Sequence, residues 1–225
     1  MIIGKKTIVV NSRAFTKLLV LMALCLFFNE AFSQYRNPYS SYTRRSGFIT
    51  GYSAQQISDQ IGFDVKYQYK TVYFQYQYYR KLAGGRTWNI DLLFQPQVNV
   101  SRYRWRYYIV EDLISIEAGV NVGILLRKNL FRDYCSVYFL PGIGPHYISG
   151  APVRQNNGFN FSDNLLAGIN VKLAQKIYLD FRTGVRHISN AHLFPPNGGL
   201  NAVVISGGIM IFTRDPRRRL PDSVW

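Results

Sequence analysis

The sequence has few of the residues that cross-link or anchor a chain. Of its two cysteines, Cys25 lies in a segment typical of a cleaved export signal, so Cys135 is left without a partner for an intramolecular disulfide. The apolar run 18–28 is too short for a membrane-spanning helix, which needs about 20 residues. His146 and His192 lack the spacing and the third donor of a metal site. These absences exclude a disulfide framework and argue against a helical anchor and a metal centre.

Acidic residues are scarce as well. The chain has 27 Lys and Arg against 12 Asp and Glu, for a formal charge of +15. Loss of residues 1–33, which hold four basic residues and one acidic residue, would lower this to +12. A basic chain with 17 Tyr and 15 Phe could bind nucleic acid. We expect no nucleic-acid partner, because the chain carries an export signal and alternates apolar and polar residues with a period of two. The many tyrosines instead suit the boundary between membrane and water.

The N-terminus predicts export across a membrane. Residues 1–33 combine a basic start, an apolar run and a cleavage site at Ala31-Phe32-Ser33. Leu24 precedes Cys25, where a lipoprotein signal would need a small residue. We therefore expect cleavage, with a mature chain that begins near Gln34.

Alternation of apolar and polar residues dominates the mature chain. From Trp88 to Val100 the even positions are apolar, interrupted only by Pro96, and the odd positions are polar apart from Leu93. Residues 114–124 repeat the pattern. A period of two predicts strands with one apolar and one polar face.

A soluble antiparallel sandwich would alternate in the same way. The export signal, a strand length of about ten residues and charges on the polar faces favour a membrane barrel instead. Those charges are Asp91, Glu117, Lys172, Asp180 and Arg182. We therefore predict an all-β fold, an eight-stranded antiparallel transmembrane β-barrel of the outer-membrane type, filled by its own side chains. The predicted strands are 47–56, 63–80, 88–100, 113–126, 134–144, 163–173, 177–187 and 202–212.

The order of the strands predicts which end of the barrel faces outward. The short connections are 81–87, 127–133 and 174–176, and the long ones are 101–112, 145–162 and 188–201. Outer-membrane barrels have short periplasmic turns and longer outer loops.

Within 63–80 the apolar parity changes at Lys70-Thr71, which indicates a bulge in one strand or a tight turn between two. The predicted division is a signal 1–33, an N-terminal extension 34–46, a barrel 47–212 and a basic periplasmic tail 213–225.

A general base and a hydroxyl stand two positions apart at the end of the seventh predicted strand. In an extended chain His187 and Ser189 would project from the same face, as nucleophilic catalysis requires. Parity places that face on the lipid side, together with Asn201 of the last strand. An outward-facing nucleophile suits a substrate that is itself a lipid.

These residues also carry a resemblance to a known family. The H-x-S-N pattern of His187, Ser189 and Asn190 is followed by P-N-G-G-L-N from Pro196 to Asn201. Here the chain resembles the lipid A 3-O-deacylases, PagL-like outer-membrane barrels grouped with acyloxyacyl hydrolases. The resemblance implies that Ser189 attacks the 3-linked acyl ester of lipopolysaccharide, with His187 as general base and no cofactor. It also implies lipid A and outer-membrane lipids as partners, with the active site at the outer leaflet of a Gram-negative outer membrane. A homodimer is left open.

The chain departs from the family at the third catalytic position. Members with a Ser-His-Glu triad carry an acid near the start of the last strand, whereas no Asp or Glu lies between His187 and Asp215 here. Asn201 occupies the matching place, and an amide can orient an imidazole without stabilising its charged form. A three-residue turn over 174–176 would instead bring Asp163 opposite His187 as an alternative acid.

The sequence also suggests residues that would bind the substrate. The predicted oxyanion donors are Asn190, by resemblance, and the backbone amides of Gly198 and Gly199. The predicted substrate-binding residues, suited to lipid A phosphates, are Arg102, Arg104 and Arg106. These arginines could equally form a solvated rim. The competing interpretation of the whole chain is a non-catalytic barrel with a structural or lipopolysaccharide-binding role.

Overall fold

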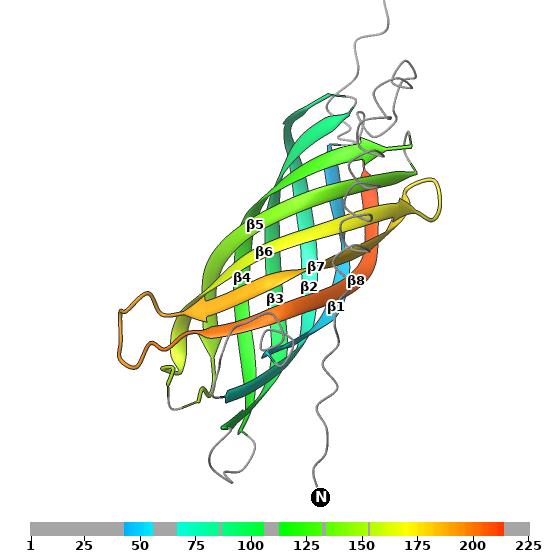
Figure 1. Cartoon of the computed structure of the whole chain (residues 1–225). Coiled ribbons are helices and arrows are strands. Elements are labelled where there is room, and N and C mark those ends of the chain that lie inside the picture. Colours follow the sequence, from blue (N-terminus) through cyan, green and yellow to red (C-terminus); the bar gives the residue numbers. More distant parts are fainter. Residues whose placement is uncertain are drawn as a thin grey trace, which may run out of the picture. The chain divides into compact units, whose positions relative to one another are not determined.

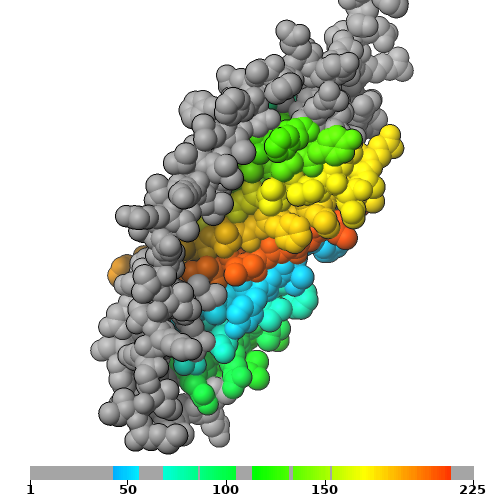
Figure 2. All heavy atoms as spheres, turned by 45° about the vertical axis from the view of Figure 1, so that its right-hand side comes forward, coloured from blue at the N-terminus to red at the C-terminus, as the bar shows by residue number. Residues whose placement is uncertain are grey.

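Eight antiparallel strands form a closed barrel. The computed structural model describes residues 43–55, 67–85, 87–105, 113–131, 134–152 and 154–213. Each strand pairs with its neighbours in the chain, and β8 pairs with β1 (Figure 1). In Figure 2 this closure appears as the orange-red β8 beside the blue β1. The strands are β1 (Arg44–Ala54), β2 (Tyr67–Gly84), β3 (Trp88–Trp105), β4 (Leu113–Leu130), β5 (Cys135–Ile148), β6 (Gly158–Lys172), β7 (Ile177–Ser189) and β8 (Leu200–Thr213). The predicted fold class is confirmed.

The strands extend slightly beyond the predicted barrel limits, from Arg44 to Thr213. The predicted signal 1–33, most of the extension 34–46 and the tail after Thr213 lie outside the described residues. In the described ranges, no helix is long and apolar enough to cross a membrane.

The predicted alternation sorts side chains between the wall and the interior. Phe94 is 49% exposed on the outside, whereas its neighbour Leu93 is 1% exposed and packs inside. Leu93, the exception in the sequence pattern, therefore fills the barrel together with apolar and tyrosine side chains. Because apolar groups cover the outside, the wall is suited to lipid.

The barrel interior is occupied by buried ion pairs. At the end where β7 finishes, Glu117 accepts hydrogen bonds from Tyr69 (2.8 Å), Tyr103 (3.0 Å) and Arg186 (3.0 Å). Towards the other end, Asp180 accepts from Tyr138 (2.7 Å) and Arg182 (3.0 Å), and Asp91 accepts from Arg45 (2.7 Å). The predicted filling of the interior by its own side chains is thus observed, and these charges face away from lipid.

The parity change predicted inside the second strand was wrong. Pairing across Lys70 and Thr71 is continuous with both neighbouring strands. Tyr69 faces inward, and its hydroxyl bonds Glu117, so it belongs to the polar face. The error arose because tyrosine was counted as apolar, although it has a polar end. The register irregularity of β2 lies instead between Lys81 and Ala83.

The connections divide the barrel into two ends. Short connections join β2 to β3, β4 to β5 and β6 to β7, and long ones follow β1, β3, β5 and β7. We call these the turn end and the loop end. At the turn end, Leu173 pairs with Ile177 across the predicted three-residue turn. That turn fixes the register between β6 and β7, and so determines what lies opposite His187.

Candidate active site

His187 and Ser189 are at the loop end of β7, and both lie on its outward face. Outward and inward residues alternate without interruption up to Ser189, and both side chains are half-buried. Their inward neighbours, Arg186 and Ile188, are buried. An extended strand therefore presents the imidazole and the hydroxyl on the same face of the wall.

His187 lies directly between residues of two neighbouring strands. It pairs with Asn201 of β8 on one side and with Asp163 of β6 on the other. Nδ1 of His187 lies 2.6 Å from Oδ1 of Asn201. Because an amide oxygen can only accept, this bond needs the hydrogen on Nδ1, and Nε2 then keeps the lone pair of a general base.

Asp163 takes the position that the turn register predicted. It is opposite His187, and its Oδ1 is buried without a hydrogen-bond partner in the described part of the chain. A buried carboxylate oxygen beside an imidazole can stabilise the positive charge that forms when Nε2 accepts a proton. Asn201 thus bonds the ring, and Asp163 lies opposite His187 on the neighbouring strand.

A hollow of about 320 Å³ lies on the wall beside the histidine. Its lining changes from polar residues near the loop end to apolar side chains further along the same strands. The residues are Asp163, Asn164, Leu165, Val185, Arg186, His187, Asn201, Ala202 and Val203. This order matches a lipid, in which a polar ester region continues into an acyl chain.

The loop between β7 and β8 holds the imidazole in place. Gly199 has a φ of 66° and packs against the ring, so that a Cβ at this position would lie 2.7 Å from Cε1 of His187. The amide of Gly199 donates to Oε1 of Gln155 (2.9 Å), a buried residue of the β5–β6 connection. Gln155 also pairs with Asn197 as an isolated bridge. Two long loops therefore support one side of the histidine.

The predicted oxyanion donors do not form an open oxyanion hole. The amide of Asn190 donates to Oδ1 of Asn197 (2.9 Å), and that of Gly198 donates to the carbonyl of Arg154 (2.7 Å). The Asn190 side chain is buried and donates to the carbonyl of Phe194. Together with the Gly199–Gln155 bond, these contacts occupy all three predicted amides. They hold the loop rather than face a substrate.

Comparison with known proteins identifies the family. The family model for lipid A 3-O-deacylase (PagL) matches residues 61–209, which is more than half of the chain. The chain belongs to the PagL family. No curated protein matches the sequence.

Two solved outer-membrane structures resemble the PagL-family barrel described above. The crystal structure of the outer-membrane enzyme PagL has 15% sequence identity and a TM-score of 0.44, covering 73% of this chain and 97% of that one. The crystal structure of the outer-membrane protein OprG from Pseudomonas aeruginosa has 9% identity and a TM-score of 0.35, covering 76% and 92%.

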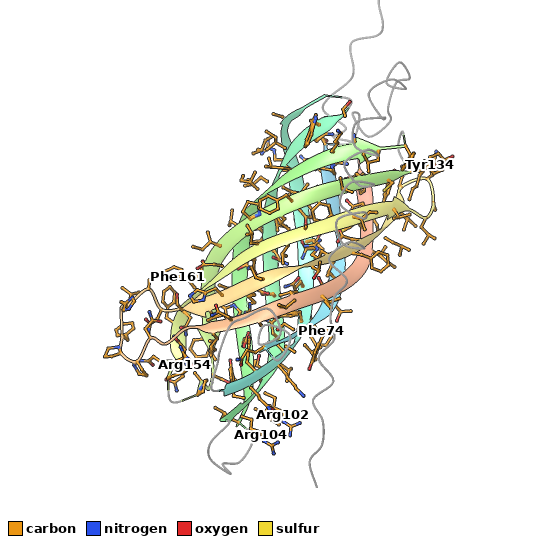
Figure 3. All side chains as sticks on the ribbon, viewed as in Figure 1. Phe74, Arg102, Arg104, Tyr134, Arg154 and Phe161 are labelled. Atoms are coloured by element: carbon orange, nitrogen blue, oxygen red, sulfur yellow. The ribbon has the colours of Figure 1, made fainter. Side chains whose placement is uncertain are left out.

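In this PagL-family barrel the predicted substrate-binding arginines lie far from His187. Arg102 and Arg104 are outward-facing residues of β3, which is four strands from β7 in either direction round the barrel. Figure 3 shows them at the loop end, apart from Arg154 and Phe161. Their predicted role in binding lipid A phosphates stays a prediction, and Arg106 lies outside the described residues.

Sequence reasoning missed the loop residues that support the PagL-family site. Arg154 donates to the carbonyl of Gly198, and Gln155 bonds both the amide of Gly199 and the side chain of Asn160. No periodicity or motif marks these residues, because their role depends on a contact between two loops. Among the described residues, no group of three or more His, Cys, Asp and Glu could hold a metal ion.

Proposed function

We propose that the protein is an outer-membrane lipid A deacylase that hydrolyses the 3-linked acyl ester of lipopolysaccharide with Ser189 and His187. Family membership supports deacylation as the reaction class. The observation that carries the residue roles is the His187–Asn201 bond, which leaves Nε2 available on the same outward face as Ser189. Long loops lie outside the cell in outer-membrane barrels, and this supports the proposal that the pair at the loop end acts at the outer leaflet.

The hydrolysis proceeds in two steps. Oγ of Ser189 attacks the ester carbonyl carbon while Nε2 of His187 takes its proton, and the sugar hydroxyl leaves with that proton as acyl-Ser189 forms. Water then attacks the acyl group and gives a proton to Nε2. The imidazolium returns this proton to Oγ as the fatty acid is released.

In place of the glutamate of a Ser-His-Glu triad, Asn201 orients the imidazole and Asp163 supplies negative charge. Asn201 accepts the Nδ1 hydrogen and fixes the orientation of the ring. Asp163 contributes negative charge from the neighbouring strand β6, which the neutral amide of Asn201 cannot supply. The hollow beside His187 takes the apolar part of the lipid, with Leu165, Val185 and Val203 along its floor.

This division predicts a kinetic effect of removing one charge. The Asp163→Asn variant keeps the size of the side chain but loses the carboxylate, so we expect kcat to fall roughly tenfold with little change in KM. The Asn201→Asp variant places a carboxylate at the Nδ1 contact, and there the same Asp163→Asn change should cost less. Kinetics of the two single variants and the double variant measure this coupling. Equal kcat in wild type and Asp163→Asn would remove Asp163 from the mechanism.

Mass spectrometry of lipid A tests the proposed function in cells. Cells expressing the wild-type chain should show lipid A lighter by one 3-linked acyl group, and cells expressing Ser189→Ala should not. Ser46, an outward-facing serine of β1 at the turn end, provides a matched control, and Ser46→Ala should behave as wild type. An unchanged acyl pattern with folded wild-type protein would instead favour the non-catalytic barrel.

A further inference from the structure

An aromatic pair lies next to the candidate nucleophile on the outer wall of the barrel. Phe159 and Phe161 are outward-facing residues at the loop end of β6, and Figure 3 labels Phe161 there. We propose that these two rings, which we call the aromatic platform, bind the sugar ring that carries the ester cut at Ser189. This role rests on the proposed function, because the sugar is the part of lipid A from which the acyl chain is removed.

The strand register places the platform beside Ser189. Phe161 pairs directly with Ser189, and this is the next outward pair towards the loop end after Asp163 and His187. Side chains that face each other across two strands have Cβ atoms about 4.5–5.5 Å apart. Phe159 follows on the same face of β6, two residues further along. The wall therefore continues from the hollow beside His187, past Ser189, into the platform.

The two rings present aromatic surface to the outside of the barrel. Their centroids are 5.1 Å apart and their planes are inclined at 83°, so they form an edge-to-face pair. Phe159 is 45% exposed and Phe161 is half-buried, whereas Asn160 between them is buried on the inward face. Because edge-to-face contacts are favourable, each ring holds the other in position before a ligand arrives.

The direction of the substrate places its sugar over the platform. The acyl chain takes the hollow, which extends from His187 towards the turn end. An ester joins its two halves on opposite sides of the carbonyl carbon, so the sugar extends from Ser189 towards the loop end. On one side of β7, strand β8 begins only at Leu200, opposite Ile188. On the other side the wall continues along β6, and the residues that it presents there are those of the platform.

The chemistry of the platform suits a sugar ring. The face of a pyranose exposes C–H groups with partial positive charge, and the faces of aromatic rings are negative. Aromatic side chains add apolar contact area, and they line many ligand sites for this reason. Exposed rings can also seat a barrel at the membrane boundary as an aromatic girdle. A girdle would hold any lipid, whereas rings beside the nucleophile would favour a lipid with a sugar headgroup.

Binding of two ether lipids to the full-length, detergent-solubilised protein tests this role. One probe is N-acetylglucosamine with a long alkyl ether at O3, and the other carries the same alkyl ether on glycerol. Neither probe contains an ester, so the protein cannot consume them. We expect wild type to bind the sugar probe about tenfold more tightly than the glycerol probe. The double variant Phe159→Leu, Phe161→Leu keeps an apolar wall but should bind the two probes within about twofold of each other.

Phe48 and Tyr76 provide the matched control. They are outward-facing rings of β1 and β2, paired across the strands, with centroids that are also 5.1 Å apart. Their strands are three and four positions from β6 round the closed barrel. The double variant Phe48→Leu, Tyr76→Leu should therefore keep the wild-type preference for the sugar probe. Heat-modifiable migration on gels verifies that each variant is a folded barrel before binding is measured.

Three outcomes would overturn the platform. They are equal binding of the two probes by wild type, a sugar preference that survives in Phe159→Leu, Phe161→Leu, and loss of the preference in both double variants. The last would show a general effect of aromatic residues on the wall. Failure of the proposed hydrolysis has a different signature, because wild type would then leave lipid A uncleaved while the sugar preference still depended on the platform.

Discussion

The His187→Gln variant is expected to hydrolyse lipid A at least about 10⁴-fold more slowly than wild type, because it removes the general base. Glutamine can still reach Asn201, so the pairing of β7 with β8 should be retained. Adding Ser189→Ala should lower the rate little further, since residues that act as one catalytic unit are strongly non-additive. Turnover of purified protein with lipid A, followed by fatty acid release, measures both effects.

His192 provides the matched control for this loss. It lies in the loop after β7, and its side chain is exposed. His192→Gln should therefore keep the wild-type rate. If His187→Gln loses less than about tenfold while the barrel stays folded, His187 is not the base.

The Gly199→Ala variant is expected to reduce kcat about a hundredfold, chiefly because it displaces the His187 ring. The new methyl group would lie 2.7 Å from Cε1 of His187, closer than Cβ atoms approach other carbons, so the imidazole must move. A shift of about 1 Å at a catalytic group is enough for such a loss. The φ of 66° adds backbone strain for any residue with a Cβ.

Gly150→Ala tests whether the effect is specific to the ring contact. Gly150 lies at the same end of the barrel, where a Cβ would make only ordinary contacts with Leu113 at 3.4 Å or more. We expect this variant to retain wild-type kcat. Nitrogen chemical shifts of His187, measured by NMR, should differ between Gly199→Ala and wild type but not between Gly150→Ala and wild type. Equal activity of the two glycine variants would contradict the positioning role of Gly199.

The parts of the site that depend on strand periodicity could be predicted from the sequence. A period of two fixed the outward faces of His187, Ser189 and Asn201, and the short turn over 174–176 fixed Asp163 opposite His187. These relations follow from local geometry that extends without interruption along regular strands. Tyr69 was misplaced because its side chain is both apolar and hydrogen-bonding.

The parts that depend on long-range contacts could not be predicted. Gln155 reaches Gly199 across 44 residues of sequence, and no pattern in either loop indicates that bond. The same contacts explain why the amides of Asn190 and Gly198 are occupied. Arg102 was predicted in the connection 101–112, whereas it lies in β3, on the side of the barrel opposite β7.

The most direct test of the central claim is covalent capture of the nucleophile. A long-chain alkyl fluorophosphonate enters from the lipid side, and Oγ of Ser189 would displace its fluoride to form a stable phosphonate ester. We predict that peptide mass spectrometry of the folded wild-type protein finds the label on Ser189, and that His187→Gln leaves this serine unlabelled. A folded wild-type barrel with unmodified Ser189, or equal labelling without His187, would contradict the account.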